Sequence, residues 1–204
     1  TIHNMTFKLE PLFAYPVLIT DERYNLKEEE RNFIELQDSI FNGNNNISSN
    51  RYILEEPNLE GLKRWIKFYV SRYYFDVMQF TDSEPYITQS WINFTKTGER
   101  HGVHCHPNSF LSGVFYLDEN ETQIEFSNYD SIFKNLEPRM KQGNIFNSHS
   151  WRYPTKKNAL FLFPSTLWHS VSPNQNQKTR ISISFNTWIK GEMGREEDLT
   201  SLKL

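Results

Sequence analysis

Three histidines and one arginine stand out because their types and spacing could hold a metal ion beside an anion. His104 and His106 are separated by one residue, His169 lies much later in the chain, and Arg180 follows it by eleven residues. A strand points alternate side chains to opposite faces, so His104 and His106 would project the same way and could share one ion. The sequence therefore predicts a metal site with a nearby anion anchor.

The expected metal chemistry is that of a site with open coordination positions. Three ligands on one side of an octahedral metal leave the other positions free for a cosubstrate and dioxygen, as in non-haem Fe(II) oxygenases. The usual set is two histidines and one carboxylate, but here His106 stands where an H-x-D motif carries aspartate. The nearest carboxylates, Asp118 and Glu125, lack the spacing expected of a ligand. His101 could replace one ligand, although a regular strand would turn it away from His104.

The first half of the chain predicts two amphipathic helices, over residues 25–40 and about 60–79. The first has acidic residues near its positive dipole end, and the second has apolar residues at spacings of three and four. Prolines in residues 9–19 exclude a central strand and indicate an edge strand. The Asn-rich tract 42–50 and the polar tract 172–178 indicate surface loops.

Beyond Pro85 the pattern favours strands. β-Branched and aromatic residues predict them at 86–94, 111–117, 122–126, 159–163 and 180–189. Helices followed by short strands favour a mainly β fold, a two-sheet jelly roll with helices packed on one sheet. The stretch 127–155 is long and irregular, which is typical of a functional loop such as a lid.

Length and composition indicate one folded domain. The 204 residues fit a single unit over 1–204, with helical support at about 25–80 and a β core at about 86–190, and the 15% aromatic content favours a packed core. Net charge is −3 with interspersed signs, so a nucleic-acid partner is not indicated. Short apolar runs argue against a membrane span, and one cysteine without a leader-like start indicates the cytoplasm.

The residues around both histidine motifs resemble those of 2-oxoglutarate- and Fe(II)-dependent oxygenases. The similar stretches cover roughly residues 86–190 and are Trp91–Asn93, His104–Ser109, Leu111–Leu117, Phe161–Ser165, Trp168–Val171 and Arg180–Asn186. Members of this group are similar to prolyl hydroxylases, have a double-stranded β-helix, and include small versions in tailed-phage and bacterial genomes. The resemblance implies Fe(II) as the metal, with 2-oxoglutarate and O2 as cosubstrates.

The resemblance also implies a role for each candidate site residue. His104 and His106 on an early strand, with His169 at the start of a late strand, would bind Fe(II). Arg180 on the next strand would pair with the distal carboxylate of 2-oxoglutarate. Tyr116 falls where prolyl hydroxylase relatives place a tyrosine that touches the same carboxylate.

Side-chain chemistry agrees with these roles and extends them. The planar guanidinium group of arginine binds a carboxylate through two hydrogen bonds, and a hydroxyl such as that of Ser182 could add one more donor. Asn93, on the preceding strand, is expected to be a secondary polar contact. Trp151, Tyr153 and Trp168 could form an apolar wall that excludes water.

The predicted function is a 2-oxoglutarate- and Fe(II)-dependent dioxygenase that hydroxylates a C–H bond and releases succinate and CO2. The substrate could be a prolyl residue in a peptide, a free amino acid, another small molecule or a nucleobase, and a phage-encoded protein would act in the host cytoplasm. The alternatives are a cupin-like metal-binding jelly roll that does not use 2-oxoglutarate, and a non-catalytic binding or virion module. Arg180 separates these functions, since only the oxygenase needs the anion anchor.

Overall fold

The computed structural model describes residues 8–119, 122–129, 135 and 139–204. The elements up to the second helix are β1 (Leu18–Ile19), α1 (Glu28–Glu35), β2 (Ser39–Phe41), β3 (Asn46–Ser48), the 3-10 turns η1 (Ile53–Glu55) and η2 (Pro57–Leu59), α2 (Glu60–Arg72) and the π-helical turn η3 (Tyr73–Val77). The strands that follow are β4 (Ser83–Thr95), β5 (His101–His104), β6 (Leu111–Tyr116), β7 (Gln123–Ser127), β8 (Ser150–Pro154), β9 (Leu160–Pro164), β10 (Trp168–Val171), β11 (Arg180–Met193) and β12 (Leu202–Lys203).

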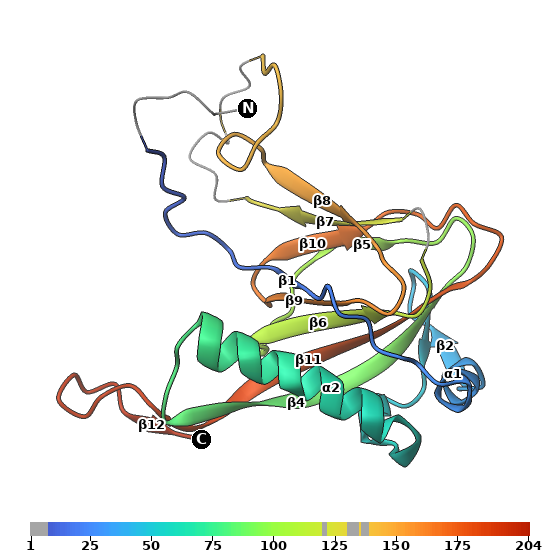
Figure 1. The fold of residues 1–204 in the computed structure, drawn as a ribbon, viewed down its shortest axis with the longest axis horizontal. Helices are drawn as coiled ribbons and strands as arrows, with labels where there is room; N and C mark the ends of the chain where they lie inside the picture. The colour runs from blue at the N-terminus through green and yellow to red at the C-terminus, as the bar shows by residue number, and fades with distance from the viewer. Residues whose placement is uncertain (1–7, 120–121, 130–134, 136–138) are drawn as a thin grey trace.

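Two sheets face each other in the described structure (Figure 1). The larger sheet has the order β1-β9-β6-β11-β4-β3-β2, and β12 pairs with β11 outside this path. The smaller sheet has the order β5-β10-β7-β8, and the strand pairs of both sheets are antiparallel. This arrangement confirms the predicted mainly β, two-sheet jelly roll.

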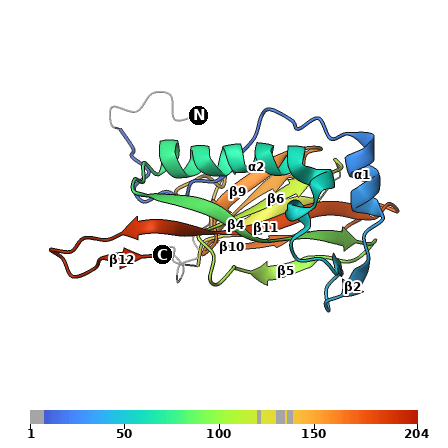
Figure 2. The ribbon, with the colours of Figure 1, turned by 90° about the horizontal axis from the view of Figure 1, so that it is seen from below.

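Helix α2 covers the face of the larger sheet that lies opposite the smaller sheet (Figure 2). Its apolar residues recur at helical spacing, so Leu62, Ile66 and Val70 are all buried on one side. They join a core with Phe115 and Ile183 from the sheet. The helix therefore supports the larger sheet from outside, as predicted.

Strands of the larger sheet alternate between this outer core and the space between the sheets. In β6, Phe115 packs in the outer core while Val114 and Tyr116 belong to a second core shared with the smaller sheet. In β11, Ile181 and Ile183 follow the outer core, so the period of two turns Arg180 and Ser182 toward the inter-sheet space. The alternating pattern at the start of β11 thus directs a cation into the interior.

Several predicted elements need correction. The first helix ends at Glu35 because residues 39–41 instead form β2, which pairs with β3. Part of the predicted surface loop 42–50 is therefore a strand, and Asn45 within that loop is fully buried. In the predicted loop 172–178, Asn174 is also fully buried. The predicted edge strand in 9–19 is confirmed only over Leu18–Ile19, at the end of the larger sheet.

The long loop predicted at 127–155 is shorter than expected. Residues 150–154 form β8, which pairs with β7 along its whole length. Residues 130–134 and 136–138 of this stretch lie outside the described residues. No helix in the described ranges is long and apolar enough to cross a membrane.

Candidate active site

A cavity of about 560 Å³ opens between the two sheets. Its lining includes three histidines from β5, the residues just after it and β10, and Arg180 and Tyr116 from β11 and β6. The sequence separates these residues by up to 76 positions, from His104 to Arg180, and the jelly roll brings them together because β5 and β10 pair side by side. The cavity is thus where the predicted metal ligands and the predicted anion anchor meet.

His104, His106 and His169 form one cluster, with their possible ligand atoms all within 4.8 Å of one another. The Nε2 atoms of His106 and His169 are 3.3 Å apart. Two imidazole nitrogens bound at about 2.1 Å to one metal, with a right angle between them, would be about 3.0 Å apart. The cluster therefore fits a single transition-metal ion with little rearrangement.

Two backbone carbonyls orient the ligand rings. His104 Nδ1 lies 2.7 Å from the Gly102 carbonyl oxygen, and His169 Nδ1 lies 2.9 Å from the Leu167 carbonyl oxygen. A carbonyl only accepts, so each Nδ1 carries the proton and each Nε2 lone pair remains for a metal. This is the tautomer that metal ligation needs.

Burial keeps the rings of His106 and His169 neutral. Burial, with the nearby His104 as a smaller cause, lowers the pKa of His169 to about 3 and that of His106 to about 4. Neutral imidazole is the ligand form of histidine, so these two side chains are ready to bind a cation near neutral pH.

His106 does not lie on the strand where it was expected. Strand β5 ends at His104, and the His106 backbone N–H instead donates to the Ser165 carbonyl oxygen at 2.9 Å. The ring lies beside Trp91, with a centroid separation of 6.2 Å. His106 reaches the cluster from the turn after β5, and the expectation that both histidines lie on one strand is wrong for this residue.

Arg180 and Tyr116 occupy the cavity as buried polar groups with spare hydrogen-bonding capacity. Arg180 is 2% exposed, its Nη1 donates to the Ser172 carbonyl oxygen at 3.3 Å, and its Nε has no hydrogen-bond partner. The Tyr116 hydroxyl is buried and also lacks a partner, and burial raises its pKa to about 12, so it remains a donor. The Arg180 guanidinium, which has no carboxylate partner among the described residues, and the Tyr116 hydroxyl together offer two unpaired donors that are suited to binding a carboxylate.

Asn93 and Ser182 lie on neighbouring strands, β4 and β11, and are paired in register. The Asn93 amide donates to Ser184 Oγ at 2.9 Å and, more weakly, to Ser182 Oγ at 3.5 Å. All three line the cavity. The structure therefore brings every predicted site residue into one cavity, and Asn93 and Ser182 form a polar strip in it.

Cavity residues that were not expected from the sequence lie in two places. His101 lines the cavity despite its odd offset from His104, because the β5–β10 register shifts between His169 and Val171. Its Nε2 lies 3.2 Å from Thr95 Oγ1, and burial, followed by the charge of Arg180, lowers its pKa to about 3. Asn42, Asn44 and Asn45 also line the cavity, although the Asn-rich tract had indicated only a surface loop.

The expected aromatic wall is built from other residues. Trp151 and Trp168 are 40% and 42% exposed, and neither these nor Tyr153 lines the cavity. Apolar lining comes instead from Trp91, Val114, Ile124, Phe163 and Phe185. Val114, Ile124 and Phe163 lie in the core between the sheets, whereas Phe185 belongs to the outer core and contributes to the lining from that side.

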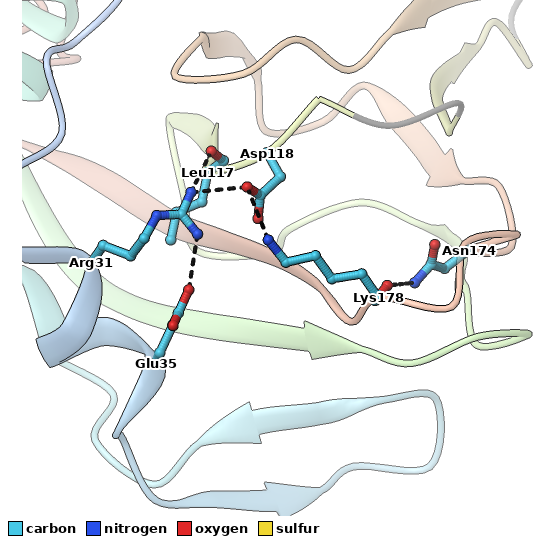
Figure 3. Close-up of polar contacts among 6 residues, drawn as sticks. All are labelled: Arg31, Glu35, Leu117, Asp118, Asn174 and Lys178. Atoms are coloured by element: carbon cyan, nitrogen blue, oxygen red, sulfur yellow. Dashed lines mark hydrogen bonds and ion pairs between the residues drawn. The ribbon is translucent and has the colours of Figure 1, made fainter. Parts of the chain in front are cut away.

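The alternative ligands considered from the sequence do not join the histidine cluster. Asp118 pairs with Arg31 at 2.9 Å and with Lys178 at 3.6 Å (Figure 3). Glu125 pairs with Arg152 at 2.8 Å. Within the part of the chain that the structure describes, the cluster contains three histidines and no carboxylate.

A family model described as "Putative 2OG-Fe(II) oxygenase" matches residues 89–186, which contain all the predicted site residues. Over this segment, which is just under half of its length, the chain matches the 2-oxoglutarate/Fe(II) oxygenase family. It is therefore an oxidoreductase of this class, whose cofactor is Fe(II) and whose cosubstrates are 2-oxoglutarate and O2. No curated protein sequence matches this oxygenase.

Solved structures show the same fold at low identity. An oxidoreductase of the 2OG-Fe(II) oxygenase family from Burkholderia pseudomallei is 13% identical, with a TM-score of 0.54 over 77% of this chain and 74% of that one. HygX from Streptomyces hygroscopicus, solved with nickel and 2-oxoglutarate bound, is 9% identical, with a TM-score of 0.56 over 84% and 82%. SnoN, an alpha-ketoglutarate-dependent epimerase from nogalamycin biosynthesis, is 11% identical, with a TM-score of 0.56 over 80% and 72%.

Proposed function

We propose that this oxygenase hydroxylates a C–H bond of a substrate bound in the inter-sheet cavity, using His104, His106 and His169 as the Fe(II) ligands and Arg180 as the anchor for 2-oxoglutarate. The observation that carries the proposal is one cavity with three convergent imidazoles and a buried arginine that has no carboxylate partner among the described residues. Each feature alone has ordinary structural explanations. Together they match the two ligands that the reaction requires.

In this proposal the histidines bind the metal, and a second group of cavity residues binds the far end of 2-oxoglutarate. Bound Fe(II) would supply the site where O2 reacts with 2-oxoglutarate, giving succinate, CO2 and oxidised substrate. Arg180 and the Tyr116 hydroxyl would hold the distal carboxylate, with Ser182 and Asn93 as further polar contacts. The aromatic and aliphatic lining would exclude water, which strengthens these charge-assisted hydrogen bonds.

The cavity lining favours a substrate whose reacting part is uncharged. The described lining contains no Asp, Glu or Lys and no arginine besides Arg180, and Asn42 and Asn44 offer neutral amides. A charged group would lose its hydration there without an ion-pair partner. An amino acid residue within a peptide, such as proline, or a neutral small molecule fits this lining, and we propose such a substrate.

The single cysteine bears on where the protein acts. We propose that the chain acts as one domain in the cytoplasm, which would be the host cytoplasm if a phage encodes it. The single free cysteine, Cys105, supports a reducing compartment.

Turnover of 2-oxoglutarate without substrate tests the proposed function. The purified protein, loaded with Fe(II) and supplied with O2 and 2-oxoglutarate, should form succinate slowly, and His169→Ala and Arg180→Ala should each abolish it. The exposed His149 provides a matched control, since His149→Ala should leave turnover unchanged. Metal binding without any succinate would instead favour a cupin-like or non-catalytic jelly roll.

A further inference from the structure

Asn174 is a fully buried asparagine in the connection between β10 and β11, the strands that carry His169 and Arg180. The sequence indicated only a polar surface loop here. Burying an amide is unfavourable unless its groups are hydrogen-bonded, so a buried asparagine in a loop has a specific set of partners. Those partners lie beside the anion anchor.

The side chain of Asn174 joins two segments that meet at Arg180. Its Nδ2 donates to the Thr95 carbonyl oxygen and to the Lys178 carbonyl oxygen, each at 2.9 Å. Thr95 is the residue paired with Arg180 across the β4–β11 ladder, and Lys178 lies two residues before Arg180. One amide therefore holds both backbones at the first rung of that ladder.

The backbone of Asn174 joins a third segment, the turn that leads into β5. Asn174 N–H donates to the Glu99 carbonyl oxygen at 2.9 Å, and its own carbonyl accepts from Gly98 N–H at 2.8 Å. The same loop supplies the Ser172 carbonyl oxygen that accepts from Arg180 Nη1. The β10–β11 connection thus contacts the guanidinium group of Arg180 directly through the Ser172 carbonyl. Through Asn174 it also fixes the backbone at the start of β11, from which Arg180 projects.

The solvent-facing side of this connection includes an exposed ion pair of Lys178. Lys178 lies 3.6 Å from Asp118, which also pairs with Arg31 of α1, and Figure 3 shows this chain of contacts leading from α1 to Asn174. The Lys178 side chain is 69% exposed. An exposed ion pair contributes little, so the buried amide is the stronger constraint on the segment before Arg180.

We propose that Asn174 is a positioning residue for 2-oxoglutarate binding. It fixes the backbone pairing between Thr95 and Arg180, and so the position from which Arg180 binds the distal carboxylate. This inference rests on the proposed function. Arg180 itself has an unpaired Nε and a single weak backbone contact, so its placement depends on the backbone beneath it. The metal cluster is held by other contacts, through Gly102 and Leu167.

The test compares Asn174→Ala and Asn174→Asp with the wild-type protein and with Asn50→Ala. Asn174→Asp keeps the size and the Oδ1 acceptor used by Asn176 N–H, but removes both donations from Nδ2. Asn50 is the matched control, because its amide also bridges two segments, Glu56 and Tyr52, but does not line the cavity. The measurements are Co(II) affinity from visible absorption, and KM for 2-oxoglutarate and kcat from succinate formation with Fe(II).

Both Asn174 variants should raise KM for 2-oxoglutarate by about 10- to 100-fold, the usual effect of removing a group that orients a ligand-binding residue. Co(II) affinity and kcat at saturating 2-oxoglutarate should stay within about threefold, since the histidine contacts are separate. Asn50→Ala should change none of the three quantities.

An unchanged KM would overturn the inference, and so would parallel losses of Co(II) affinity and kcat. Failure of both Asn174 variants to fold would also overturn it, because the residue would then support the fold and not the anchor. A wild-type protein that forms no succinate contradicts the proposed function itself, which keeps the two failures distinct.

Discussion

The strands that carry the candidate site are buried to different extents in the two sheets. The larger sheet carries Arg180 and Tyr116, and the smaller sheet carries or adjoins the three histidines. In the larger sheet, all six residues of β6 are buried and β11 begins with four buried residues, including Arg180 and Ser182. In the smaller sheet, β5 has only four residues, none fully buried, and Val103 is 51% exposed. Arg180, the proposed anion anchor, thus lies on a tightly packed sheet, while two of the three histidines lie on or just after a short edge strand.

This difference indicates how the two ends of the site become ordered. Helix α2 and the outer core fix the larger sheet before any ligand binds. The smaller sheet has no helix of the described chain on its outer face, so β5 depends on β10 and on the histidine cluster. A metal bound by His104, His106 and His169 would join β5 to β10, and we expect it to stabilise the smaller sheet most.

The largest expected effect comes from the anchor. Arg180→Met should weaken 2-oxoglutarate binding by about 2–5 kcal/mol, the usual cost of removing one partner of a buried charge pair. The free energy of unfolding without ligands should not fall, because the arginine is a buried cation with no carboxylate partner among the described residues. Calorimetric titration and urea unfolding measure the two quantities. A large loss of stability would make Arg180 a structural residue.

Alanine substitutions at one glycine in each sheet would compare the packing of the two sheets directly. A Cβ added at Gly113 of β6 would lie 2.2 Å from Phe185 Cζ and 2.8 Å from Leu162 Cδ2, whereas nothing lies within 4 Å of one added at Gly102 of β5. Gly113→Ala should therefore cost about 1–3 kcal/mol of stability. Gly102→Ala should stay within about 0.5 kcal/mol. Equal effects in urea unfolding would contradict the contrast between the sheets.

Metal binding should stabilise the smaller sheet selectively. Co(II) at one hundred times its dissociation constant should raise the free energy of unfolding by about 2.7 kcal/mol. Hydrogen exchange should slow at the amides of β5 and β10 more than at those of β6 and β11, because the ligands join the first pair. Uniform slowing in both sheets, or none, would contradict the account. His169→Ala should remove the effect.

The smallest expected effect, for a single side chain and a single pH unit, is the pH dependence of the metal-free protein. Burial lowers the folded-state pKa values of His101, His106 and His169 to about 3 to 4. Between about pH 4 and 6.5 the unfolded chain therefore binds more protons, so the free energy of unfolding falls as pH falls, by about 1 kcal/mol per pH unit for each histidine. Urea unfolding at several pH values measures the slope. His169→Gln should reduce it, and His149→Gln should not.

The sequence predicted those parts of the site that depend on local periodicity. The alternation of Arg180, Ile181, Ser182 and Ile183 indicates that Arg180 and Ser182 face inward, because a strand of the larger sheet keeps its period of two. The apolar spacing of α2 likewise indicated a helix that covers a sheet. Both patterns repeat within one element and need no knowledge of the partner strand.

Features that depend on partners distant in sequence were missed. The register shift between β5 and β10 brings His101 into the cavity, and no local pattern encodes it. Pairing with β4 makes a strand of Asn46–Ser48, in a tract whose composition indicates a loop. His106 reaches the cluster from a turn anchored at Ser165, a contact across 59 residues.

The central claim is that the histidine cluster and Arg180 form one site for Fe(II) and 2-oxoglutarate. The most direct test adds both to the purified protein without oxygen and records the weak visible charge-transfer band of a chelated α-keto acid. We expect this band in the wild-type protein, its absence in His169→Ala, and its appearance in Arg180→Met only at much higher 2-oxoglutarate concentration. Iron binding with no band in the wild-type protein would contradict the claim.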